Sequence, residues 1–342
     1  MLSYDVAGDG PDVVLLHPGI GDRRMWDCQW PWLTADHRTV RCDLRGFGQS
    51  PVPPEPYQSA GDVLELVDRL GIERAVLVGG SLGGRVALEV AVARSALVAG
   101  LVLVSPALPG HAWSEDVSSF GDAEDEALDA GDVDAAVELN LKMWFDGPGR
   151  TSAAVDPIRR ASVAVMQRRA FELQRAADTE DMEELLVPDL PERLAEITVA
   201  TVILVGEHDA SDFWAIGEQI AATLSNAQFH LLAGTAHVPY YERPEVFRPR
   251  ARDRARRSDL RPYRGRVALS AGRHVTAMAI VTRVAVGGRR RSDTCPRQFG
   301  VHQARYFPQP YFTHGRRSGY PTGSGTRSGG VSSVSRTTGG RA

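Results

Sequence analysis

The chain has 342 residues, enough for one large domain or two, and its net charge of −4 conceals two unlike segments. Residues 1–247 carry 18 Lys and Arg against 40 Asp and Glu, whereas residues 248–342 carry 21 Arg, no Lys and 3 Asp. The three cysteines, Cys28, Cys42 and Cys295, are odd in number and lack metal-ligand spacing, which argues against a disulfide framework or a cysteine metal site. No stretch resembles a secretion signal or a membrane span, so we expect a cytoplasmic protein with no membrane partner.

The first hundred residues alternate between apolar runs and amphipathic segments. The apolar runs predict buried strands at residues 12–17, 39–43, 75–78 and 101–105, and helical spacing predicts helices at 59–70 and 82–93. Strands that alternate with helices favour a mostly parallel sheet with helices on both faces. We therefore predict an α/β fold.

A glycine-flanked serine lies between the third predicted strand and the helix that follows it. Ser81 has Gly79 two positions before it and Gly83 two positions after it. A serine in a sharp strand-to-helix turn needs neighbours without bulk, and the helix N-terminus directs N–H groups toward an anion formed there. Ser81 is therefore a candidate nucleophile, although a plain glycine-rich turn has the same pattern.

Another glycine-rich loop, His17-Pro18-Gly19-Ile20-Gly21, follows the first buried strand. In open α/β sheets the loops at the carboxyl ends of strands build the site, so this loop is a candidate donor of a backbone N–H to the reaction. A plain turn explains the same residues.

Residues 111–194 interrupt the alternation and offer only helical segments. These are an acidic one around 124–130, one at 133–145 and one at 158–177. An insertion of this kind after a strand end is interpreted as a helical cap over the site, and its acidic run as a solvated face. Met143 and Trp144 are candidate pocket residues, although an aromatic side chain at helical spacing is also typical of a core.

The sheet pattern resumes with predicted strands at 200–205 and 228–232, separated by a helix at 212–224. Asp209 follows the first of these strands and His237 follows the second, so both are expected on the edge that carries Ser81. The order Ser, Asp, His along the chain matches the nucleophile-elbow arrangement of acyl-transfer enzymes. Asp212 is an alternative to Asp209.

Together these residues resemble the α/β-hydrolase superfamily over residues 1–247, especially its small bacterial esterases, enol-lactonases and cofactor-free haloperoxidase-like members. The matching motifs are His17-Pro18-Gly19, Asp43 to Ser50, the Ser81 elbow, Gly206 to Asp209, Gly234 to His237, and Glu242 to Glu245. The resemblance implies an α/β-hydrolase domain with the cap inserted at about 111–194. It also implies Ser81, Asp209 and His237 as a catalytic triad, without a metal or organic cofactor.

The resemblance predicts a serine hydrolase that cleaves a small ester or lactone through an acyl-enzyme on Ser81. The backbone N–H groups of Leu82 and of Gly19 or Ile20 would form the oxyanion hole, and Trp144, Met143 and Val238 would contact the substrate. The alternatives are carbon–carbon bond hydrolysis of a diketone, a perhydrolase, or a non-catalytic or inactive ligand-binding protein of the same fold. The small-molecule substrate is the only partner that the sequence identifies, and the oligomeric state stays open.

Residues 248–342 depart from the family, because Arg248-Pro249-Arg250 interrupts the expected final helix. Their Arg-rich, Lys-free composition is typical of a GC-rich gene translated in another reading frame, and we expect this tail to be disordered. Binding of nucleic acid by the tail is a weaker alternative, because Arg-rich segments with interspersed Tyr and Phe bind phosphates and stack on bases.

Overall fold

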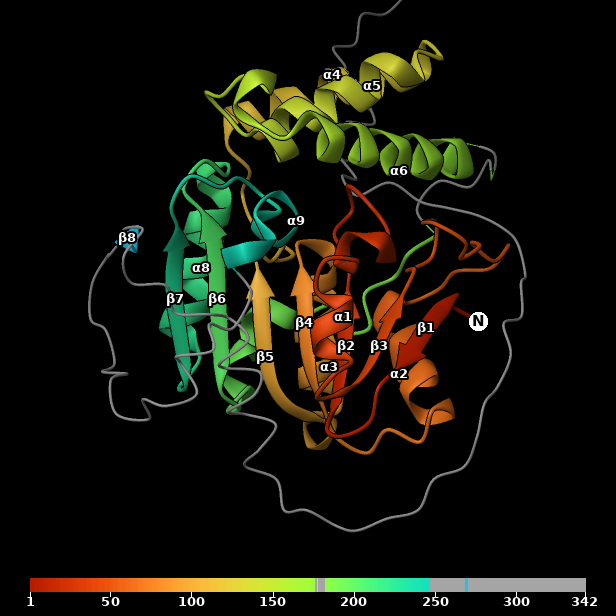
Figure 1. Ribbon diagram of the computed structural model, residues 1–342, viewed down its shortest axis with the longest axis vertical. Coiled ribbons are helices and arrows are strands. Elements are labelled where there is room, and N and C mark those ends of the chain that lie inside the picture. Colours follow the sequence, from red (N-terminus) through yellow and green to blue (C-terminus); the bar gives the residue numbers. More distant parts are fainter. Residues whose placement is uncertain (176, 178–181, 247–267, 270–342) are drawn as a thin grey trace, which may run out of the picture. The chain divides into compact units, whose positions relative to one another are not determined.

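The structure is a computed structural model that describes residues 1–175, 177, 182–246 and 268–269. Within these residues the chain forms one sheet in the order β1-β3-β2-β4-β5-β6-β7-β8 (Figure 1). The strands are β1 (Tyr4–Ala7), β2 (Asp12–Leu16), β3 (Arg38–Cys42), β4 (Ala75–Gly80), β5 (Val98–Val104), β6 (Thr201–Gly206), β7 (Ala227–Leu232) and β8 (Ala268–Leu269). Neighbouring strands are parallel except β1 and β3. The carboxyl ends of the parallel strands therefore meet at one edge of the sheet.

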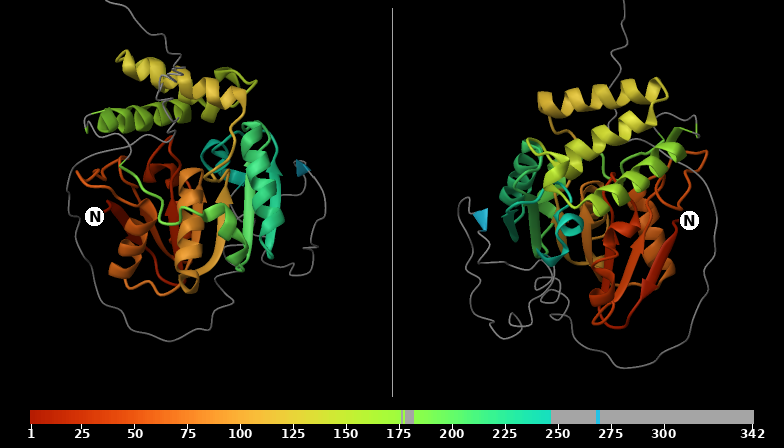
Figure 2. Two further views of the ribbon diagram at one scale, coloured as in Figure 1. Left: turned by 180° about the vertical axis from the view of Figure 1, so that it is seen from behind. Right: turned by 45° about the horizontal axis from the view of Figure 1, so that its top comes forward.

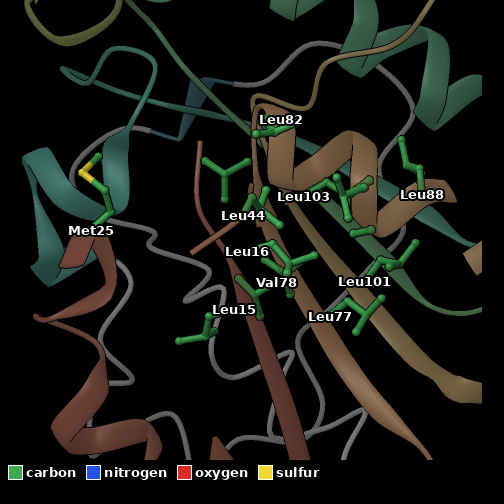
Figure 3. Close-up of a cluster of buried hydrophobic side chains, with 14 of the residues drawn as sticks. Leu15, Leu16, Met25, Leu44, Leu77, Val78, Leu82, Leu88, Leu101 and Leu103 are labelled. Carbon is green, nitrogen blue, oxygen red and sulfur yellow. The ribbon is translucent and has the colours of Figure 1, made fainter. Parts of the chain in front are cut away.

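The central strands are apolar throughout because both of their faces are covered. Leu77 of β4 lies opposite Leu101 of β5, and both side chains are buried. Figure 3 shows them near Leu88, which comes from the helix that follows β4. Burying one leucine side chain contributes roughly 1.5–3 kcal/mol. The buried leucines therefore stabilise the sheet from which the loops at the strand ends extend.

Helices cover both faces of the sheet. Figure 2 (left) shows α2, α3 and α8 on one face, and Figure 1 shows α1 on the other. The buried residues of α2, Val63, Leu66 and Val67, follow the spacing of one helix face. The helices around the sheet are α1 (Trp30–Leu33), α2 (Ser59–Arg69), α3 (Leu82–Ala93), α7 (Leu190–Arg193), α8 (Ser211–Thr223) and α9 (Pro239–Glu242).

Three further helices form a layer above the carboxyl ends of the strands, which we call the cap (Figures 1 and 2). They are α4 (Glu115–Asp129), α5 (Val133–Asn140), which continues as a π-helical segment Leu141–Asp146, and α6 (Pro157–Arg175). The Arg160 guanidinium joins α6 to α5 by donating to Asp146 at 2.9 Å and to Glu138 at 2.8 Å. The cap helices are therefore tied to one another by ion pairs as well as by apolar packing.

This architecture confirms the predicted α/β-hydrolase fold, with a mostly parallel sheet, helices on both faces and a helical cap. Two strands differ in detail from the sequence pattern. Strand β5 begins at Val98, three residues before the predicted run, and β1 pairs with β3 although its sequence alternates only weakly. The expectation of a disordered tail falls outside the described residues, apart from Ala268–Leu269, which pair with β7.

The turn between β4 and α3 leaves no room for side chains at two positions. Ser81 has φ 49° and ψ −111°, a conformation that residues other than glycine rarely adopt. A Cβ atom on Gly79 would lie 2.2 Å from the carbonyl oxygen of Gly83, and one on Gly83 would lie 2.4 Å from the carbonyl oxygen of Leu16. The steric role predicted for both glycines is therefore confirmed.

We expect Gly83→Ala to lower the free energy of unfolding by about 2–3 kcal/mol, because the new methyl group overlaps the backbone at Leu16 and pushes the two segments apart. Gly110→Ala is the matched control: Gly110 also borders a loop, but no atom lies within 4 Å of its Cβ position. Because Gly110 has a positive φ of 74°, Gly110→Ala should cost about 1–2 kcal/mol in backbone strain but nothing in steric overlap. Urea unfolding of both variants measures the difference, and an equal or smaller loss for Gly83→Ala would contradict the steric account.

Candidate active site

Ser81 lies where β4 ends and α3 begins, and its backbone is held from three sides. Its N–H donates to Val104 at 2.8 Å, and its carbonyl oxygen accepts from Arg85 at 3.0 Å and Ala107 at 3.1 Å. The Ser81 side chain lines a cavity between this edge of the sheet and the cap. A non-glycine residue held at positive φ costs roughly 1–3 kcal/mol, and such strain is concentrated at functional sites.

His237 and Asp209 form a buried pair on the same edge. The Nδ1 atom of His237 lies 3.0 Å from each carboxylate oxygen of Asp209, and both side chains are almost fully buried. The imidazole therefore donates from Nδ1 to the carboxylate, which leaves Nε2 as its basic atom. His237 also lines the cavity with Ser81, so the structure brings all three predicted residues to one place.

Asp212, the alternative acid, has other partners. Its carboxylate accepts from the backbone N–H and the hydroxyl of Ser114, both at 2.7 Å, and lies 3.2 Å from Nε2 of His111. Burial raises the pKa of Asp212, but these hydrogen bonds outweigh it, and the pKa lies below its ordinary value. Asp212 therefore fixes the start of α4, and of the two aspartates Asp209 is the one that is hydrogen-bonded to His237.

The loops that carry Asp209 and His237 are bonded to each other. The N–H of His208 donates to Thr235 at 2.8 Å. A Cβ atom on Gly206 would lie only 2.0 Å from the carbonyl oxygen of Ala236, so glycine is required for the two loops to approach this closely. The contact between Asp209 and His237 thus rests on backbone geometry as well as on the side chains.

Glu242 on α9 holds the His237 loop from the other side. One carboxylate oxygen accepts from the Ala236 N–H at 2.8 Å, and the other lies 2.8 Å from the Arg150 guanidinium. Arg150 belongs to the segment between α5 and α6, so this ion pair links the His237 loop to the cap. The sequence pointed to Glu242 only as part of a family motif, and its role depends on contacts across the fold.

The glycine-rich loop after β2 lies beside the elbow. Gly19, Ile20 and Leu82 line the cavity together with Ser81, and the Gly83 N–H donates to the carbonyl oxygen of His17 at 3.2 Å. The predicted donor residues for an oxyanion are therefore placed at the same cavity as the candidate nucleophile.

The ring of His17 holds this loop in place. Its Nε2 accepts from the Leu44 N–H at 2.8 Å, so Nδ1 carries the proton and donates to Pro18 at 2.9 Å. Burial lowers the pKa of His17 to about 4, which keeps the ring neutral at physiological pH. His17 is a structural residue in this arrangement.

Aromatic side chains enclose His237 within the cavity. The ring centroid of Phe213 lies 4.3 Å from that of His237, and the ring centroid of Trp144 lies 5.0 Å from it. The cavity has a volume of about 80 Å³. Its lining residues are Gly19, Ile20, Ser81, Leu82, Ala107, Trp113, Glu124, Asn140, Trp144, Gln167, Phe171, Gln174, Phe213 and His237.

Of the three residues predicted to contact a substrate, only Trp144 is among those that line this cavity. Val238 is fully buried in the hydrophobic core, and Met143 packs against that core. Trp113 and Phe213 also line the cavity, although the sequence does not identify them, because the segments that bear them look like ordinary core helices or loops. The packing of the cap helices determines which aromatic side chains reach the cavity. The local sequence pattern does not predict that packing.

Glu124 departs from the expectation of a solvated acidic face. Its side chain is buried, lines the cavity and accepts a hydrogen bond from Nδ2 of Asn140. Burial raises the pKa of Glu124 to about 7. Helical spacing offered the missed signal, because Val117, Phe120 and Glu124 fall on one face of α4.

The described residues offer neither a metal site nor a membrane-spanning helix. Among the described residues, no group of three or more His, Cys, Asp or Glu side chains is placed to hold a metal ion. None of the described helices is both long enough and apolar enough to cross a bilayer. Cys28 and Cys42 are free thiols, and burial raises the pKa of the Cys42 thiol.

The elbow, the loops after β6 and β7 and the helical cap define the class of protein. The profile of the alpha/beta hydrolase family matches residues 13–250, and the chain belongs to this family. The match ends close to the change in composition at Arg248.

Several individual relatives are named as hydrolases. RutD from Rhizobium rhizogenes, provisionally named a carbamate hydrolase, is 30% identical over 262 residues, covering 72% of this chain and 94% of its own. The pimeloyl-[acyl-carrier protein] methyl ester esterase of Yersinia enterocolitica is 28% identical, covering 75% and 98%. The crystal structure of the enol-lactonase from Burkholderia xenovorans has a TM-score of 0.59 and 25% identity, and the match covers 72% of this chain and 93% of that one. The chain is thus similar to enzymes named for cleaving ester, lactone and carbamate bonds.

Proposed function

We propose that the protein is a serine hydrolase that cleaves a small ester or lactone through an acyl-enzyme on Ser81. The observation that carries the proposal is the Asp209–His237 hydrogen bond beside a cavity that Ser81 also lines. Relatives named for ester and lactone hydrolysis support the substrate class.

In this mechanism Nε2 of His237 takes the proton of Ser81 while the serine oxygen attacks the substrate carbonyl carbon. Asp209 keeps the imidazole in the tautomer that accepts at Nε2 and stabilises the imidazolium that forms. The alcohol leaves with the proton from His237, and water then attacks the acyl-enzyme by the same route in reverse.

The backbone N–H groups of Leu82 and of Gly19 or Ile20 would stabilise the oxyanion of the tetrahedral intermediate. Each donor in a comparable site contributes about 3 kcal/mol to the stability of the transition state. The position of Leu82 at the first turn of α3 adds the positive end of the helix dipole. The aromatic walls around His237 exclude water, which strengthens these interactions.

Hydrolysis of p-nitrophenyl acetate, butyrate and hexanoate, and of the lactone dihydrocoumarin, tests the proposal directly. We expect kcat/KM of about 10⁴ M⁻¹ s⁻¹ or more for at least one of these four compounds, the lower end of the range for enzymes. A β-diketone is included to test for carbon–carbon bond hydrolysis. If the protein hydrolyses only the diketone, that reaction replaces the proposal. If the folded protein hydrolyses none of these compounds, a ligand-binding role is favoured.

A further inference from the structure

The cap contributes polar side chains to the wall of the cavity as well as the aromatic rings of Trp144 and Phe171. Glu124 of α4, Asn140 at the end of α5, and Gln167 and Gln174 of α6 line the cavity that Ser81 lines from the sheet. Glu124, Asn140 and Gln167 are buried, so these polar groups are part of a built surface and not of a solvated rim. Three cap helices thus present polar side chains toward one enclosed space.

Hydrogen bonding within this wall is incomplete. The amide nitrogen of Asn140 donates both to Glu124 and to the carbonyl oxygen of Ala136, so its donor capacity is used inside the cap. The Oε1 atom of Gln167 is buried and has no hydrogen-bond partner among the residues that the structure describes. Buried acceptors are nearly always satisfied in folded proteins, so an unpartnered acceptor on a residue that lines the cavity favours a ligand group that donates to it.

The charge of the side chains that line the cavity restricts the chemical class of the ligand further. Glu124 is the only acidic residue among the described residues that line the cavity, and no Lys or Arg is among them. Burial raises the pKa of Glu124 to about 7, so its carboxyl group is partly protonated near neutral pH. Such a wall attracts hydroxyl or ammonium groups and repels a carboxylate.

We propose that Glu124 and Gln167 form an acceptor subsite for a hydroxyl or ammonium group at the far end of the substrate. The inference rests on the proposed function, because the ester or lactone carbonyl would lie at Ser81 while the polar end reaches the cap. Phe171, Trp144 and Phe213 line the cavity as well and would contact the apolar part of the molecule between its two ends. The preferred substrates are therefore neutral or cationic esters with an apolar middle and a hydrogen-bond donor at the end.

Four p-nitrophenyl esters of equal chain length test this subsite: hexanoate and its derivatives with a terminal hydroxyl, ammonium or carboxylate group. We expect the hydroxyl-ended ester to exceed hexanoate in kcat/KM by about tenfold, mainly through KM, and the carboxylate-ended ester to be the poorest substrate. Equal kcat/KM for hexanoate and its hydroxyl derivative, or a preference for the carboxylate, would overturn the subsite.

Two variants assign the preference to its residues. Gln167→Met keeps the volume but removes the unpartnered acceptor, and should reduce the hydroxyl-to-methyl ratio of kcat/KM to about one. Glu124→Gln should abolish any advantage of the ammonium ester. Glu126→Gln, the same change at an exposed residue of α4 that does not line the cavity, should leave both ratios as in the wild type. Unchanged ratios in both cavity variants would contradict the assignment.

A binding measurement separates failure of the subsite from failure of the proposed function. If none of the four esters is hydrolysed, the proposed function fails, and the subsite is then measured by thermal unfolding with hexane-1,6-diol and with hexan-1-ol. The subsite predicts a larger rise in Tm with the diol, lost in Gln167→Met. Equal shifts with both alcohols would overturn it.

Discussion

Ser81→Ala is expected to lower kcat for ester hydrolysis by about 10⁴- to 10⁶-fold, because no other group in the cavity replaces the attacking oxygen. The variant removes one oxygen atom and leaves the glycines that shape the elbow unchanged. Its unfolding midpoint in urea should therefore stay close to that of the wild type. Steady-state kinetics on the best ester, with active-site titration to exclude contaminating hydrolases, measure the loss.

Ser105 offers a matched control for this prediction. It also has a positive φ, 44°, at the end of a parallel strand, and it is fully buried, but it does not line the cavity. Ser105→Ala should therefore leave kcat within about threefold of the wild type, as expected of a change away from the reacting atoms. Similar losses of kcat in Ser81→Ala and Ser105→Ala would mean that disturbance of the strand ends, and not removal of the nucleophile, lowers the rate.

Asp209→Asn is expected to reduce kcat by about 10⁴-fold, the loss known when an acid–histidine pair is broken in this way. The amide would present an N–H group to Nδ1 of His237 and favour the tautomer that carries its proton on Nε2. That imidazole cannot accept the proton of Ser81. The pH profile should also change, because hydroxide can partly replace the disabled base and activity should rise steadily toward high pH.

Asp212→Asn is the control for the acid. Asp212 is three positions away and equally buried, but its hydrogen-bond partners are Ser114 and His111, whereas Asp209 is bonded to His237. Its replacement should cost stability at the start of α4 and reduce kcat by less than about tenfold. If Asp212→Asn were as damaging to kcat as Asp209→Asn, the assignment of the acid would be wrong.

Much of the fold could be predicted because its strands are buried on both faces. A strand such as β4 or β6 needs a continuous apolar run, and the parallel arrangement then places Ser81, Asp209 and His237 at one edge. The sequence left Asp209 and Asp212 both open, since both follow the same strand. The choice depends on the approach of Gly206 to Ala236, a contact between distant segments.

The cap shows why the rest of the site could not be predicted. Glu124 belongs to an acidic run, and local composition favours a solvated face, but packing of α4 against Trp144 turns this one carboxyl group inward. Gln167 likewise looks like a surface residue of a polar helix. Burial of such residues depends on how helices pack together, and hydrophobic patterning records only the apolar side of that packing.

We retain the division into a hydrolase domain at 1–247, with the cap inserted at about 111–194, and a separate tail at 248–342 as a proposal. It is supported by the family match, which ends at residue 250, and by the relatives, which are covered almost completely by 72–75% of this chain. Gene sequencing and the intact mass of the natively expressed protein would decide whether the tail is translated as written.

Intact-mass analysis after treatment with a fluorophosphonate tests the central claim most directly, because this reagent reacts with an activated serine and requires no knowledge of the substrate. The account predicts one phosphonyl adduct per chain, located on the peptide that contains Ser81, absent from Ser81→Ala and strongly reduced in Asp209→Asn. A folded protein that gains no adduct, or gains it at another residue, would contradict the role of Ser81 as the nucleophile.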